Sequence, residues 1–162
     1  MALALERLLT PSTRPPERPT PQEVEAGLNI GLNISVVYTS VDATLGALKQ
    51  AGSLADRLGA HITLVVPQIV PRPLPLDSPP VLIDWNENRF RVMASEVPVQ
   101  TTVQIYLCRD RWETLDSVLK PHSLVVVGSK PGGRKRWWPT PESRLANKLR
   151  KAGHEVIFTE TE

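Results

Sequence analysis

Ser123-Leu-Val-Val-Val-Gly-Ser129 is the strongest indication of fold in this 162-residue chain. A run of four apolar residues, three of them valine, is typical of a strand buried on both faces of a parallel sheet. Four more runs rich in β-branched residues lie at 34–38, 61–66, 99–107 and 155–159. The sequence therefore predicts five strands.

Segments with helical spacing separate these strands. Between 43 and 59 the apolar residues recur every three or four positions, after Asp42 as a suitable N-cap and up to Gly59 as a terminator. Three further segments are predicted to be helical: 81–96, 110–119 and 142–152. Strands that alternate with helices favour an α/β fold, namely a doubly wound, five-stranded, mostly parallel sheet with helices on both faces.

Proline marks the irregular parts of the chain. Six of the 16 prolines lie within 67–80, which predicts an excursion without regular structure. Five more lie within 11–21, so we expect residues 1–31 to form a Pro-rich, flexible N-terminal tail. Leucines at positions 3, 5, 8 and 9 leave open a short helix there. Residues 32–162 are predicted to form one domain.

Composition narrows the class of protein. With 41% hydrophobic and 22% charged residues the chain falls in the globular range, and this excludes a fibrous or wholly disordered protein. No apolar stretch approaches the roughly 20 residues of a membrane span. Cys108 is the sole cysteine, so one chain can form no disulfide. We expect an unexported protein in the reducing cytoplasm.

The sequence offers little for catalysis. Ligands of doubly wound sheets bind at the carboxyl ends of the strands, whereas His61, His122 and His154 each stand where a strand begins. We therefore assign no catalytic residue and no metal ligand, and interpret the histidines as surface turn residues. Cys108 follows a strand beside Arg109, which can lower a thiol pKa, but no base accompanies it. We expect it to be a small buried side chain.

Phosphate binding is a better hypothesis for the carboxyl end. Gly128-Ser-Lys-Pro-Gly-Gly133 leaves a central strand and leads to the start of the last helix. Glycines let backbone N–H groups approach an anion, and the free N–H groups of a helix start complete such a cradle. Ser143, in the first turn of that helix, adds a hydroxyl.

The order of elements and these residues together resemble the universal stress protein family over residues 33–159. The match is best at Ser123–Ser129, at Ser143–Leu149 and at Glu155–Phe158. The resemblance implies an adenine nucleotide alpha hydrolase-like fold and a homodimer through the edge strand at 155–159. It also implies ATP or AMP, with Mg²⁺, as ligand. The residues that would form the nucleotide site are Tyr38, Thr39, Ser40, Val66, Val127, Gly128, Ser129, Gly132, Gly133 and Ser143.

This chain departs from the family pattern in three places. Pro131, which has no N–H to give a phosphate, stands where the second motif glycine belongs, and Glu142 replaces the glycine before Ser143. Tyr38-Thr39-Ser40 stands where nucleotide binders have an acidic residue. We therefore expect a non-catalytic regulatory or ligand-sensing domain with weakened or lost ATP binding. The alternative is an ATP- or AMP-binding protein with slow nucleotide hydrolase activity.

Charge is concentrated near the last helix. Between Lys130 and Lys151 there are eight basic residues and one acidic residue, although the net charge of the whole chain is only +2. Two tryptophans accompany three of these cations in a run that suits a polyanion or an anionic surface: Arg134, Lys135, Arg136, Trp137 and Trp138. Polyanion binding is thus a third hypothesis, and its alternative is that the tryptophans fold back onto the sheet.

Overall fold

The computed structural model describes residues 31–131 and 138–161 and, for backbone alone, residues 5–8. These residues form one sheet of six strands in the order β1-β4-β3-β2-β5-β6. The strands are β1 (Leu5–Leu8), β2 (Asn33–Val37), β3 (His61–Ile69), β4 (Thr101–Cys108), β5 (Leu124–Ser129) and β6 (Glu155–Glu160). The helices are α2 (Val41–Leu58), α3 (Ile83–Ser95), α4 (Arg111–Val118) and α5 (Pro141–Lys151).

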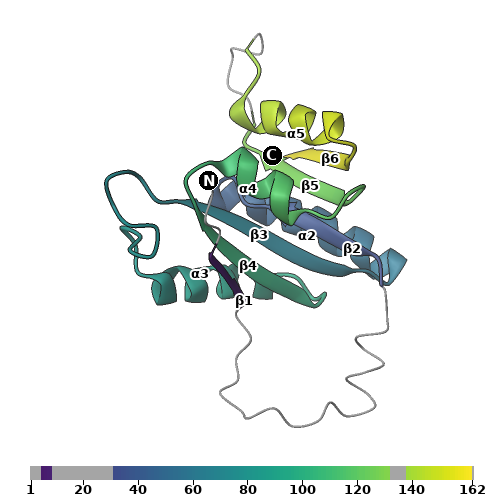
Figure 1. Ribbon diagram of the computed structural model, residues 1–162. Helices are drawn as coiled ribbons and strands as arrows, with labels where there is room; N and C mark the ends of the chain where they lie inside the picture. The colour runs from purple at the N-terminus through teal and green to yellow at the C-terminus, as the bar shows by residue number, and fades with distance from the viewer. Residues whose placement is uncertain (1–4, 9–30, 132–137, 162) are drawn as a thin grey trace.

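Helices cover both faces of the sheet. Strands β2 to β6 are all parallel to one another. In Figure 1, α4 and α5 lie in front of the sheet and α2 and α3 lie behind it. The core has two layers, one between the sheet and α2 and α3, the other between the sheet and α4 and α5. The predicted doubly wound α/β fold is therefore confirmed.

Strand β1 adds a sixth strand at one edge. Residues 5–8 pair antiparallel with β4, with Leu5 opposite Leu107 and Leu8 opposite Gln104. The short helix left open for these leucines is therefore wrong. An edge strand such as β4 has a row of unpaired backbone groups, and these favour an extended partner over an isolated helical turn.

Strand β3 is longer than the sequence predicts. It continues through Pro67 to Ile69 and pairs with β4 along this extension. The backbone of Val65 faces β2, because its carbonyl oxygen accepts a hydrogen bond from the N–H of Tyr38 at 3.0 Å. Pro67, two residues later, faces the same side, where β2 has ended. Its missing N–H therefore costs no ladder bond.

The excursion after β3 is held to the body by one arginine. Arg109 donates to the carbonyl oxygen of Val70 at 2.7 Å and to that of Leu74 at 2.6 Å. Beyond Ile69 the predicted irregular structure is confirmed up to α3, with turns at 72–73 and 76–77.

Helix α2 begins before its predicted cap. Ser40, with extended backbone, is the N-cap, whereas Asp42 lies in the first turn. Predicting Asp42 as the cap was therefore wrong. The Asp42 carboxylate instead lies 3.5 Å from the ammonium of Lys130 just beyond β5, in an exposed ion pair. Asp42 remains favourable at this helix end because a negative charge suits the helix dipole.

Gly128 lets α2 approach β5 closely. A Cβ built on Gly128 would overlap the carbonyl oxygen of Ala43 and would lie 3.2 Å from the Cβ of Ala47. Both alanines belong to α2 and are buried. Any larger residue at 128 must push the helix away from the sheet, so this glycine is required for packing.

We predict that Gly128→Ala lowers the free energy of unfolding by about 3 kcal/mol, because overpacking against helix backbone cannot be relieved by a side-chain rotation. Urea denaturation followed by circular dichroism measures this loss. Gly59→Ala is the matched control, since a Cβ there meets nothing within 4 Å and only the left-handed backbone at φ 62° is strained. It should cost about 1 kcal/mol. Equal losses would contradict the packing role of Gly128.

Candidate functional site

The strand order places one candidate site at the carboxyl ends of β2 and β5. Chain connections leave β2 toward β3 on one side, and β5 lies on its other side, so the order reverses between these two strands. Two helices begin at this end, α2 after β2 and α5 after β5. Open α/β sheets bind ligands at this position.

Thr39 joins the two strands at this end. Its hydroxyl donates to the carbonyl oxygen of Gly128 at 3.0 Å, and its backbone N–H donates to the hydroxyl of Thr44 in α2 at 3.2 Å. Ser40 follows, and its Oγ is buried without a hydrogen-bond partner among the described residues. Of these two hydroxyls, that of Thr39 is engaged in structure and that of Ser40 is the one left unpaired.

The phosphate-loop candidates at the end of β5 are turned inward. Gly128 is buried beneath α2, and Ser129 is 3% exposed with its hydroxyl donating to the carbonyl oxygen of Lys130 at 3.0 Å. Val127 is fully buried in the layer beneath α4 and α5. Gly132 and Gly133 lie outside the described residues. The side chains of Val127 and Ser129 are therefore used in packing and internal hydrogen bonding.

The start of α5 is capped from within. Thr140 is the N-cap, and its hydroxyl accepts the N–H of Ser143 at 3.1 Å. The hydroxyl of Ser143 donates to the carbonyl oxygen of Thr140 at 2.9 Å. Glu142 lies in the first turn beside them. One N–H group and one hydroxyl that would otherwise face an anion are thus already used.

Tyr38 and Val66 line one pocket of about 240 Å³ beside this end. Its walls come from the extension of β3 and from α3. The Tyr38 ring packs edge-on against Phe90 with centroids 5.0 Å apart. Across the pocket the amide of Asn86 donates to that of Gln68 at 2.9 Å. The pocket combines an aromatic edge with amides.

Arg111 is a residue of this end that sequence reasoning missed. It opens α4, and its guanidinium donates to the carbonyl oxygen of Tyr38 at the end of β2. Its Nε is buried with no partner in the described part of the chain. Burial lowers the pKa of Arg111, and the carboxylate of Glu142 opposes that shift. The available signal was its position directly after the Asp110 cap at the carboxyl end of β4.

Cys108 is shielded at the same end of the sheet. The residue is 1% exposed, and its thiol donates to the carbonyl oxygen of Gln68 at 3.6 Å. Burial raises the pKa of this thiol, an effect that a hydrogen bond with Thr114 partly offsets. The prediction that Cys108 is a small buried side chain is therefore confirmed. A buried thiol with a raised pKa is also a poor nucleophile.

The histidines differ from one another. His154 is 8% exposed and its Nδ1 accepts the N–H of Ser123 at 3.2 Å, so its interpretation as a surface turn residue was wrong. Its ring satisfies a backbone donor between β5 and β6. Among the described residues, no group of three His, Cys, Asp or Glu side chains is placed to hold a metal ion.

The basic aromatic run is described only at its end. Trp138 is 76% exposed, while Arg134, Lys135, Arg136 and Trp137 lie outside the described residues. Trp138 therefore does not fold back onto the sheet. No helix in the described part of the chain is both long and apolar enough to cross a membrane.

Comparison of the fold with solved structures finds universal stress proteins. The structure of a universal stress protein from Archaeoglobus fulgidus superposes with a TM-score of 0.51 at 14% identity, covering 83% of this chain and 98% of that one. UspA from Lactobacillus plantarum gives 0.49 at 20% identity, with 79% and 97% covered. A universal stress protein in complex with cAMP gives 0.47 at 14% identity, with 81% and 98% covered.

No protein-family model matches the sequence. No curated protein matches it either. The chain therefore has a universal stress protein-like fold, and this confirms the resemblance drawn from the strand and motif order at the level of fold.

Proposed function

We propose that residues 32–162 form a non-catalytic, ligand-sensing domain of universal stress protein type, acting in the cytoplasm, with weak binding of adenine nucleotides. The supporting observation is that the hydroxyls of Ser129 and Ser143 already donate to backbone carbonyl oxygens. A phosphate group would have to displace these bonds, and each displaced bond reduces the net gain on binding.

One charged side chain at this end of the sheet would attract a phosphate, and another would repel it. Arg111 offers a buried guanidinium nitrogen without a partner, whereas Glu142 places a carboxylate in the first turn of α5. A carboxylate at a helix start competes with a phosphate for the positive end of the helix dipole. We therefore assign Arg111 as the attractive group and Glu142 as the group that weakens nucleotide binding.

We predict that ATP and AMP bind with dissociation constants above about 100 μM, with and without Mg²⁺, in isothermal titration calorimetry. Glu142→Gln should tighten ATP binding about tenfold, because it removes a like charge from the helix start. Glu96→Gln, at the far end of α3, is the matched control and should change nothing. Micromolar binding by the unaltered protein would instead support the alternative, a nucleotide-binding hydrolase.

A homodimer through β6 is the proposed assembly. Strand β6 stands at one edge of the sheet and pairs with β5 on its inner side. Val156, Ile157 and Phe158 in it are half-buried, and no proline or lysine interrupts the strand. An edge strand of this kind is a template for pairing with a second copy.

We predict a dimer of about 36 kDa, twice the chain mass of 18.0 kDa, in size-exclusion chromatography with light scattering. Val156→Pro should give a monomer, since the N–H of Val156 faces away from β5 and proline removes it from edge pairing. Unchanged far-ultraviolet circular dichroism would show that the variant is folded. An unaltered protein that stays monomeric at about 100 μM would contradict this assembly.

Polyanion binding is a second candidate function, favoured by the exposure of Trp138. The side chain is 76% exposed, and in the sequence it follows the cations Arg134, Lys135 and Arg136. Exposed aromatic rings beside cations suit stacking on bases of single-stranded nucleic acid.

We predict weak binding of single-stranded DNA in fluorescence anisotropy, falling steeply between about 50 and 200 mM salt because bound counterions are released. Replacing Arg134, Lys135 and Arg136 together with serine should abolish this binding and leave the melting temperature unchanged. A control triple replacement at Arg57, Arg72 and Arg91 should retain it. Salt-independent binding, or none at low salt, would eliminate this candidate.

A further inference from the structure

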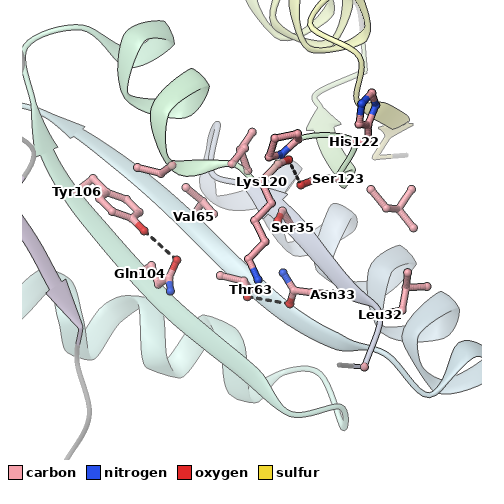
Figure 2. Close-up of a pocket in the computed structure, with 15 residues that line it drawn as sticks. Leu32, Asn33, Ser35, Thr63, Val65, Gln104, Tyr106, Lys120, His122 and Ser123 are labelled. Carbon is pink, nitrogen blue, oxygen red and sulfur yellow. Dashed lines mark hydrogen bonds between the residues drawn. The ribbon is translucent and has the colours of Figure 1, made fainter. Parts of the chain in front are cut away.

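Helix α4 covers only part of its face of the sheet. At the amino ends of the strands this face is open and polar. At the amino ends of β2, β3 and β4 a groove of about 770 Å³ runs between the strands and the segment that joins α4 to β5. Figure 2 shows Lys120 on one wall and Asn33, Thr63 and Gln104 on the floor. This is the opposite end of the sheet from the site described above.

The floor of the groove changes character along each strand. Toward the carboxyl end Val37 and Val65 pack beneath α4, against Leu115. Toward the amino end the side chains of this same face are polar, with Ser35 opposite Thr63 in the strand register. Parallel sheets are normally covered by apolar contacts on both faces. A polar floor beneath an open groove therefore favours a polar occupant.

Hydrogen bonds within the groove leave donors facing outward. The Thr63 hydroxyl donates to Oδ1 of Asn33 at 3.0 Å, and the Tyr106 hydroxyl donates to Oε1 of Gln104 at 2.9 Å. Both amide oxygens are therefore occupied. Neither amide nitrogen donates a hydrogen bond to another described residue, so each offers two N–H groups to a ligand.

The described lining of the groove carries charge of one sign. Among the residues that the structure describes, the fifteen that line it include Lys120 and no aspartate or glutamate. The Lys120 side chain extends across the groove toward Thr63 and Asn33 (Figure 2). Lys120 forms no ion pair within the described part of the chain, where Lys130 pairs with Asp42. The ammonium and the nearby amide nitrogens together suit an oxyanion.

We propose that this groove binds a small hydroxylated anion, such as a sugar acid or a sugar phosphate. The anionic group would lie against Lys120 and Asn33, and the hydroxyl groups would bond to Gln104, Thr63 and Ser35. The volume is that of a small-molecule site. A polymer is disfavoured here because the groove supplies one lysine, whereas polyanion binding needs a row of cations. This site is independent of the nucleotide function proposed above.

The test uses the full-length protein labelled with ¹⁵N and titrated with sodium gluconate, followed by amide chemical shifts. Sorbitol, which has the same hydroxylated chain without the charge, is the ligand control. Gluconate should bind with a dissociation constant of about 1 mM or lower and shift Asn33, Thr63 and Gln104, and sorbitol should bind at least about tenfold more weakly. Glucose 6-phosphate distinguishes a phosphate from a carboxylate as the preferred group.

Matched variants locate the site. Lys120→Met should weaken gluconate binding about tenfold, and Lys49→Met, an exposed lysine on α2, should not. Thr63→Val should weaken it as well, whereas Thr102→Val, opposite Thr63 on β4 but outside the groove, should not. Unchanged melting temperatures would show that the variants are folded. Equal binding of gluconate and sorbitol, equal effects of the two lysine variants, or no binding of either anion would overturn the proposal.

Discussion

The close approach of α2 to β5 at Gly128 determines how the central strands and the first helix of the domain fit together. It brings the backbone of Ala43 against the central strands, and Thr39 joins the same glycine to the end of β2 by a hydrogen bond. These contacts fix where α2 begins and how far apart the ends of β2 and β5 lie. The candidate ligand site at the carboxyl end is built on this junction, so its geometry is set by packing before any ligand is considered.

The same junction also explains why we propose different ligands for the two ends of the sheet. At the carboxyl end the serine hydroxyls and the helix start are bonded internally, and the opposed charges of Arg111 and Glu142 remain. At the amino end, α4 spans only residues 111–118, and the polar floor beyond it stays open. The weak nucleotide binding and the separate small-anion groove that we propose both rest on which polar groups the fold has already paired.

The fold was predictable because buried parallel strands and amphipathic helices produce strong local patterns of apolar residues in the sequence, as at 124–129 and 41–58. The errors arise where tertiary contacts decide. Pro67 stays in a strand because β2 has ended beside it, and Leu5 to Leu8 become a strand because β4 offers an edge. The sequence did not predict a role for Arg111, because this residue bonds to a carbonyl oxygen that lies 73 residues away in the sequence. The groove likewise brings together residues from four strands, from the end of α4 and from the segments that precede β2 and β5, and no local sequence pattern predicts this.

We propose that the carboxyl end of the sheet binds nucleotide weakly and does not cleave it. The most direct measurement is ³¹P nuclear magnetic resonance of ATP incubated with the protein and Mg²⁺, alongside a sample without protein. ATP should be hydrolysed over many hours no faster than in the sample without protein, with resonances broadened only at millimolar concentrations. Release of ADP and phosphate in proportion to protein concentration would contradict it.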